Sequence, residues 1–172
     1  MSQLAGRGDV VVLGARSLPA GQRAADHIVP AAERAGGRVL ARRLDVTDPD
    51  SVAAIARELE DSYGRLDLLV NNAAIHYDAW QRATDADLAV VREALETNLL
   101  GTWQTTLTLL PLLWRSAAGR IVNVSSEAGS LAAMGGGTPA YRVSKAALNA
   151  LTRMLAAELR PAGVLVNAVC PG

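Results

Sequence analysis

The stretch DVVVLGARSLPAGQRAADHIVPAAERAGGRVLARRL, residues 9–44, decides the fold class. An aliphatic run at 9–15 is followed by apolar residues three and four apart over 20–36, and a second aliphatic run occupies 38–44. The two runs are typical of buried strands, whereas the spacing between them is typical of a helix that ends at the glycine pair 36–37. A strand, a helix and a second strand in this order predict parallel strands joined by a right-handed crossover.

The same alternation continues to the end of the chain. Further strands are predicted at 65–71, 119–125 and 163–169, and further helices at 49–63, 84–116 and 140–159. This order predicts a single α/β domain over 1–172: a doubly wound, Rossmann-like parallel sheet with helices on both faces. Pro111 lies inside the helix at 84–116 and is expected to kink it or to end it near Leu110, because proline donates no backbone hydrogen bond.

Composition excludes several classes of protein. Half of the 172 residues are hydrophobic, and 17 acidic residues balance 17 basic ones, so disorder or a general attraction to nucleic acid is not indicated. The apolar runs are shorter than the roughly 20 residues that a membrane span needs. The single cysteine, Cys170, excludes an internal disulfide framework and favours a cytoplasmic location; we expect it to be a small buried side chain.

The segment TPAYRVSKAALNALTRMLAAEL, residues 138–159, contains the most informative chemistry. Tyr141 and Lys145 are four residues apart, so they share one face of the predicted helix. A phenol is a weak acid and base at neutral pH, but a neighbouring ammonium favours the phenolate and lowers the phenol's pKa. Lys145 is the only lysine among the 17 basic residues, which makes an accidental surface pair a poor explanation.

The sequence resembles the short-chain dehydrogenase/reductase family. Within that family it is most similar to the carbonyl-reductase-like members. The resemblance covers essentially the whole chain, and its motifs occur in the family's order. They are LVNNAAI at 69–75, with Ala74 in place of the usual glycine, TNLLGT at 97–102, GRIVNVSSEAG at 119–129, AYRVSKAAL at 140–148 and VNAVCPG at 166–172.

The resemblance implies hydride transfer between a nicotinamide cofactor and a small carbonyl or alcohol substrate. Tyr141 would be the general acid or base, and Lys145 would lower its pKa and bind the nicotinamide ribose. Ser126 would hold the substrate oxygen, and Asn98 would hold a water of the proton relay behind Lys145. The glycine-rich loop MGGGTP at 134–139 lengthens the spacing from serine to tyrosine, so Ser125 and Ser130 remain alternatives to Ser126.

The resemblance also predicts the cofactor. The family places an acidic residue at the end of its second strand when it binds NAD, whereas here Ala15 and Arg16 occupy this region, and arginine suits the extra phosphate of NADP(H). NADP(H) is therefore preferred over NAD. The carboxylate of Asp45 would contact the adenine. The other residues implied in cofactor binding are Val46, Asn72, Ala73, Ala74, Tyr141, Lys145, Pro171 and Gly172.

One family motif is missing. No Thr-Gly-x-x-x-Gly-x-Gly loop precedes the run at 9–15, which therefore corresponds to the family's second strand, after the end of a helix at 1–9. The last strand is missing too, so we expect an incomplete domain with reduced cofactor affinity. The alternative is a non-catalytic binding or assembly module. The helices at 84–116 and 140–159 would form the surface of a homodimer or homotetramer. No metal site is predicted for His27 or His76, and His76 is a candidate to face the substrate cleft.

Overall fold

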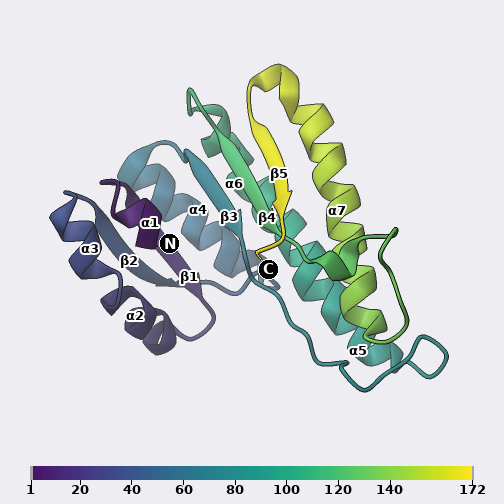
Figure 1. Cartoon of the computed structure of the whole chain (residues 1–172). Helices are drawn as coiled ribbons and strands as arrows, with labels where there is room; N and C mark the ends of the chain where they lie inside the picture. Colours follow the sequence, from purple (N-terminus) through teal and green to yellow (C-terminus); the bar gives the residue numbers. More distant parts are fainter. Residues whose placement is uncertain (1, 172) are drawn as a thin grey trace. The chain divides into compact units, whose positions relative to one another are not determined.

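The computed structural model describes residues 2–171, with side chains from residue 3. It consists of two compact units, Met1–Ile55 and Ala56–Gly172, and each is described by itself. Both have the predicted α/β character, with parallel strands joined by helices (Figure 1). The sequence-based prediction of a single domain stays a prediction.

The first unit is the predicted strand–helix–strand unit, preceded by one helical turn. Its elements are α1 (Ser2–Ala5), β1 (Val10–Ala15), α2 (Leu18–Asp26), α3 (Val29–Arg34) and β2 (Arg38–Arg43). β1 and β2 pair in parallel, from Val10 opposite Arg38 to Ala15 opposite Arg43. Ala5, Val11 and Ala32 form a small buried core, and Leu4, Ile28 and Val39 pack against it.

The single helix predicted at 20–36 is wrong in one respect, because the structure divides it into α2 and α3. The first helix ends at Asp26, and the second begins at Val29 with a proline in its first turn. Pro30 has no backbone N–H to donate to the carbonyl of Asp26 and its ring crowds that carbonyl, so a continuous helix is unfavourable here. Pro30 is instead well placed at the start of α3, where first-turn N–H groups have no helical partner.

The second unit is built on a three-stranded parallel sheet in the order β3-β4-β5. Asn71 of β3 lies opposite Asn123 of β4, which lies opposite Ala168 of β5. The boundary between the two units falls within α4. From that helix onward the elements are α4 (Pro49–Tyr63), β3 (Leu68–Asn71), α5 (Leu88–Leu95), the π-helical η1 (Glu96–Gly101), α6 (Thr102–Trp114), β4 (Arg120–Val124), the 3₁₀ turn η2 (Glu127–Gly129), α7 (Pro139–Leu159), the 3₁₀ turn η3 (Arg160–Ala162) and β5 (Leu165–Val169).

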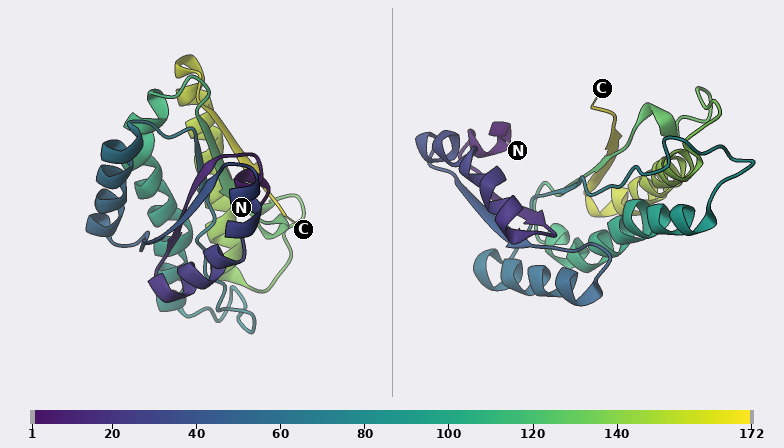
Figure 2. Two further views of the ribbon diagram at one scale, coloured as in Figure 1. Left: turned by 90° about the vertical axis from the view of Figure 1, so that its left-hand side faces the viewer. Right: turned by 90° about the horizontal axis from the view of Figure 1, so that it is seen from below.

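Within the described residues of the second unit, helices cover one face of this three-stranded sheet. α6 contacts β3 and α7 contacts β5, and Figure 2 shows both helices along the same face. On the other face Val70, Leu165 and Val169 are 38%, 48% and 40% exposed. β3, β4 and β5 succeed one another in a single direction, so two right-handed crossovers bring their helices to the same side.

Pro111 was expected either to kink its helix or to end it near Leu110. The second alternative is wrong, because the helix does not end there. α6 continues through it to Trp114. One backbone hydrogen bond is lost at the proline, but Leu109, Leu112 and Leu113 are buried, and their packing outweighs that loss.

Two expectations from composition can be compared with the structure. Cys170 is exposed, so the expectation of a buried thiol is wrong; it directly follows β5, which pairs with β4 alone in the described part of the chain. Within residues 2–171 none of the helices is both long enough and apolar enough to cross a membrane.

Candidate active site

Tyr141 and Lys145 lie side by side on α7, as the spacing predicted. The ammonium of Lys145 lies over the phenol ring, 5.6 Å from its centroid. Lys145 is only 2% exposed, and its Nζ donates a hydrogen bond of 2.7 Å to the backbone carbonyl of Val124, the last residue of β4. A buried lysine held at the end of a strand is a cation with a defined position beside the phenol.

Burial lowers the pKa of Lys145 below its ordinary value of 10.5, because the charged form loses hydration. Between the folded and the unfolded pKa the unfolded chain binds more protons, so the free energy of unfolding rises with pH in that window. We expect Lys145→Met to abolish this rise. Since Lys145 is the only lysine, its ¹³Cε NMR resonance reports the pKa directly, and a midpoint at or above 10.5 would contradict the prediction.

Asn98 is completely buried in the π-helical segment η1 and ties three segments together. Its Oδ1 accepts from the backbone N–H of Ile75 at 2.7 Å, and its Nδ2 donates to the carbonyl of Ile75 at 3.0 Å and to the hydroxyl of Ser144 at 2.9 Å. Ser144 in turn donates to the carbonyl of Tyr141. The side chain therefore has a structural role at the site, and its part in a water relay stays a proposal.

Ser126 and Ser125 have different surroundings. The hydroxyl of Ser125 is buried and donates to Asn149 Oδ1 of α7 at 2.7 Å. Ser126 is half-buried, and its hydroxyl accepts from the backbone N–H of Ala128 at 3.2 Å, which leaves its own proton to donate. This geometry favours Ser126 over Ser125 as the group that holds a substrate oxygen.

The turn η2 after Ser126 packs closely against α7. A Cβ on Gly129 would lie 2.7 Å from the carbonyl carbon of Lys145, closer than any side chain can approach. Asn149 also donates from Nδ2 to the carbonyl of Gly129 at 3.1 Å. The glycine thus allows the segment that carries Ser126 to lie against the turn of α7 that carries Lys145.

A buried chain of hydrogen bonds supports this end of the sheet. Asn71 donates to Thr106 of α6 and to Asn123 of β4, and Asn123 donates to Thr152 of α7. All four side chains are less than 9% exposed. Because buried amides are costly unless paired, this network favours a single register of β3 against β4 and connects both helices to the strands.

The residues predicted to bind the adenosine part of the cofactor lie at the carboxyl ends of β1 and β2. Arg16 is exposed directly after β1. Hydrogen bonds from the backbone N–H and the hydroxyl of Thr47 hold the pKa of Asp45 below its ordinary value, and the charge of Arg16 contributes less. The sequence reasoning missed Ser17, which caps the N-terminus of α2 beside Arg16 and accepts from the N–H of Ala20. An arginine next to a helix N-terminus is suited to an anion.

The remaining predicted cofactor residues are distributed as follows. Val46 is half-buried after β2, and Asn72, Ala73 and Ala74 are exposed directly after β3. Pro171 is exposed, and Gly172 lies outside the described residues. No group of three or more potential metal ligands is found in residues 2–171.

His76 and Asp78 also lie beside Tyr141; the sequence indicated His76 only as a candidate to face the substrate cleft, and Asp78 was not predicted. His76 stacks on the phenol ring of Tyr141, and the carboxylate of Asp78 accepts hydrogen bonds from the first N–H groups of α7. Neither belongs to a motif with a recognisable spacing. The only available signal was their position just after the strand at 65–71, where the loops of parallel sheets carry functional groups.

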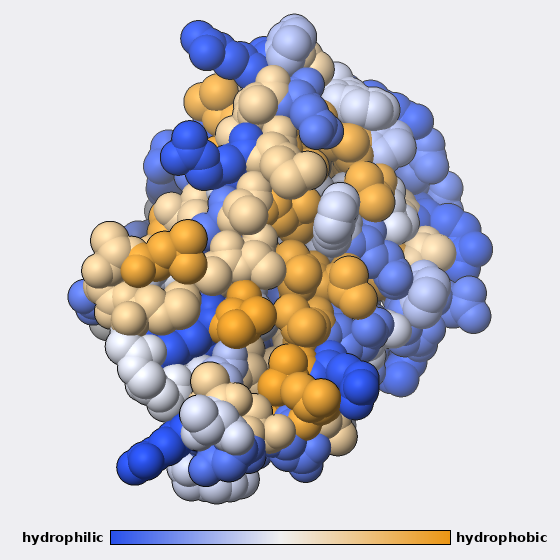
Figure 3. Space-filling model, turned by 90° about the vertical axis from the view of Figure 1, so that its right-hand side faces the viewer, coloured by the Kyte–Doolittle hydropathy of each residue, from blue (hydrophilic) through white to orange (hydrophobic). Residues whose placement is uncertain are grey.

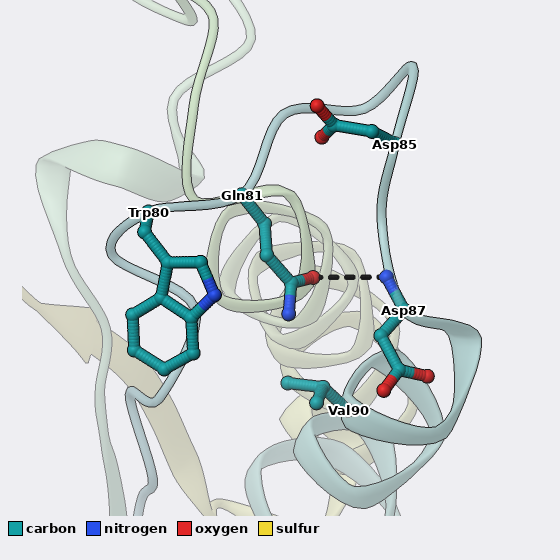
Figure 4. Close-up of a pocket in the computed structure, with 5 residues that line it drawn as sticks. All are labelled: Trp80, Gln81, Asp85, Asp87 and Val90. Atoms are coloured by element: carbon teal, nitrogen blue, oxygen red, sulfur yellow. Dashed lines mark hydrogen bonds between the residues drawn. The ribbon is translucent and has the colours of Figure 1, made fainter.

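A hollow of about 520 Å³ lies beside the start of α7 and is lined by Trp80, Gln81, Asp85, Asp87 and Val90. Figure 4 shows the indole of Trp80 on one side of it and a hydrogen bond from the Asp87 N–H to the Gln81 side chain, 3.0 Å long. Trp80 is 78% exposed. The four predicted catalytic side chains do not line this hollow in the described structure.

Comparisons with known proteins show the family to which the chain belongs. The sequence model of the family described as short chain dehydrogenase matches residues 1–172. Oxidoreductase UcpA of Escherichia coli strain K12 is 39% identical over 138 residues, which are 80% of this chain and 51% of UcpA. The chain therefore spans about half the length of this curated relative.

Solved structures show the same similarity. A short-chain type dehydrogenase/reductase from Mycobacterium marinum is 31% identical, with a TM-score of 0.88 over 99% of this chain and 67% of that one. The NADP active-site complex of Pseudomonas aeruginosa RhlG is 32% identical, with a TM-score of 0.82 over 99% of this chain and 64% of that one. This chain belongs to the short-chain dehydrogenase family, whose members are NAD(P)-dependent oxidoreductases.

Proposed function

We propose that this chain transfers hydride between NADP(H) and a small carbonyl or alcohol substrate. The observation that carries the proposal is the buried Lys145 ammonium, held over the ring of Tyr141 at 5.6 Å. The bound cofactor would supply or accept the hydride. Tyr141 would give its proton to the substrate oxygen during reduction, and Lys145 would stabilise the phenolate that remains.

The other residues of the proposal position the reacting oxygen. The hydroxyl of Ser126 would donate to it, so that two donors are aimed at the atom that gains charge. Asn98 would hold a water that returns a proton towards Lys145 and Tyr141. Lys145 and Tyr141 would also contact the nicotinamide ribose, together with Pro171 and Gly172, while Asn72, Ala73 and Ala74 would line the cofactor.

Preference for NADP(H) over NAD is the second part of the proposal. Arg16 and the N-terminus of α2 fit a phosphate, and no carboxylate stands at the end of β1 to receive a ribose hydroxyl. Asp45 would contact the adenine, with Val46 beside it. We also propose that the protein is located in the cytoplasm.

Arg16→Ala tests this preference. The variant is expected to bind NADPH about 10- to 100-fold more weakly and NADH unchanged, since a hydrogen bond to a charged group contributes about 1.5–3 kcal/mol. The assay follows NADPH fluorescence on binding and NADPH oxidation with a simple ketone or quinone. Arg23→Ala, which changes an exposed arginine within α2, is the control. Equal losses for both cofactors would contradict the NADP preference, and wild-type chain without binding or turnover would favour the non-catalytic module.

We further propose that the protein forms a homodimer or homotetramer through α5, α6 and α7. Leu100 of η1 and Trp103, Leu107 and Trp114 of α6 are 45%, 36%, 54% and 54% exposed, and Val143 and Met154 of α7 are exposed as well. Figure 3 shows apolar side chains gathered in a band on one face, with hydrophilic ones to its right. Contiguous exposed apolar surface of this kind is typical of protein interfaces.

A further inference from the structure

The imidazole of His76 lies against the phenol ring of Tyr141. The two ring centroids are 4.3 Å apart, and the ring planes differ by 20°, which is a stacked arrangement. His76 comes from the segment after β3 and Tyr141 from the first turn of α7. The histidine side chain remains about half exposed, so this contact is a property of the site and not of the buried core.

The backbone on both sides of His76 is held in place. The preceding residue, Ile75, has its N–H and its carbonyl hydrogen-bonded by the side chain of Asn98, at 2.7 and 3.0 Å. Two residues further on, Asp78 is 1% exposed, and its Oδ2 accepts from the N–H of Ala140 at 2.7 Å and of Tyr141 at 3.3 Å. The ring of His76 is therefore carried by a segment attached to both η1 and α7.

Asp78 replaces the missing cap of α7. Thr138 precedes the helix with a φ of 45° and makes no capping hydrogen bond with its side chain, so the first N–H groups need another acceptor. A carboxylate suits that place because the N-terminus of a helix is electropositive. The second oxygen, Oδ1, is buried without a hydrogen-bond partner within the described residues and lies 3.9 Å from Nε2 of His76. Asp78 thus holds Tyr141 through the backbone, and its second oxygen faces the imidazole of His76.

We propose that His76 is a positioning residue for Tyr141. Its ring closes one side of the phenol and holds the side chain in the rotamer that carries the reactive hydroxyl, while Asp78 keeps His76 and the first turn of α7 together. Stacking on one face restricts the swing of the phenol about its Cα–Cβ bond, and small displacements of a proton donor lower the rate. The inference rests on the proposed function, because it assumes that Tyr141 moves a proton.

Three variants test the positioning role kinetically. His76→Ala is expected to lower kcat by about 2- to 12-fold, the range expected for an aromatic pair, without changing the KM for NADPH. His76→Phe keeps a flat ring and is expected to retain the wild-type kcat. His27→Ala, in the first unit, is the control. Wild-type kcat in His76→Ala, or an equal loss in His76→Phe, would overturn the proposal.

A second measurement needs no turnover. The chain has two histidines, so the imidazole C–H resonances of His76 are assigned by comparison with His76→Ala. The ring current of Tyr141 is expected to shift them upfield. Tyr141→Leu should remove the shift, Tyr141→Phe should keep it, and His27 should be unaffected. An inactive chain with these shifts would refute the proposed function alone, whereas unshifted His76 resonances in an active chain would refute the positioning role alone.

Discussion

Tyr141→Phe is expected to lower kcat for carbonyl reduction by about 10²- to 10⁴-fold, the range associated with a general acid. The substitution removes only the hydroxyl and keeps the ring that stacks on His76 and faces Lys145. The fold should therefore change little, and any rise in the KM for NADPH measures the proposed contact of the hydroxyl with the nicotinamide ribose. Steady-state kinetics with NADPH and a ketone, together with thermal unfolding, separate the two effects.

Tyr63→Phe is the matched control, because it removes the same atom from a tyrosine at the end of α4 that is 41% exposed. Its kcat should equal that of the wild type. A Tyr141→Phe variant that keeps kcat within about threefold of the wild type would rule out Tyr141 as the proton donor.

Asn98→Leu is expected to lower the free energy of unfolding by about 3 kcal/mol or more. The change leaves the N–H and the carbonyl of Ile75 buried and unpaired, and each unpaired group costs about 1–3 kcal/mol. Loss of the bond to Ser144 adds to this cost. Denaturant unfolding measures the change.

The free energy of unfolding of Asn98→Asp should lie between those of the wild type and Asn98→Leu. The aspartate keeps an acceptor for the N–H of Ile75 but has no donor for its carbonyl. Asn167→Ala, at an exposed position in β5, should stay within about 0.5 kcal/mol of the wild type. An Asn98→Leu variant as stable as Asn167→Ala would show that these hydrogen bonds contribute nothing to stability.

Much of the fold could be read from local patterns. The five aliphatic runs are the five strands, with ends within three residues of the prediction, because the strands of parallel sheets are rich in aliphatic residues. The helix at 140–159 is also confirmed, with Tyr141 and Lys145 on one face. The break at Pro30 and the continuation through Pro111 were less predictable. Proline has the same local effect in both places, and burial of the neighbouring leucines decides the second case.

Part of the candidate site could also be predicted from the sequence, and part could not. Tyr141 and Lys145 could be paired from sequence because helical periodicity alone places residues four apart on one face. No local pattern places His76 on the ring of Tyr141, Asp78 at the start of α7 or Asn98 on the backbone of Ile75. These contacts join segments that are distant in the sequence.

The sequence by itself therefore determined the α/β class, the order of strands and helices, the family and the Tyr141–Lys145 pair. Each of these depends on local spacing or on short motifs. Only the tertiary structure decided which face of the β3-β4-β5 sheet the helices cover and that Lys145 is anchored to Val124. It also placed a histidine and a buried carboxylate beside the phenol. These features depend on packing and on the need of buried polar groups for partners, which segments remote in the chain supply.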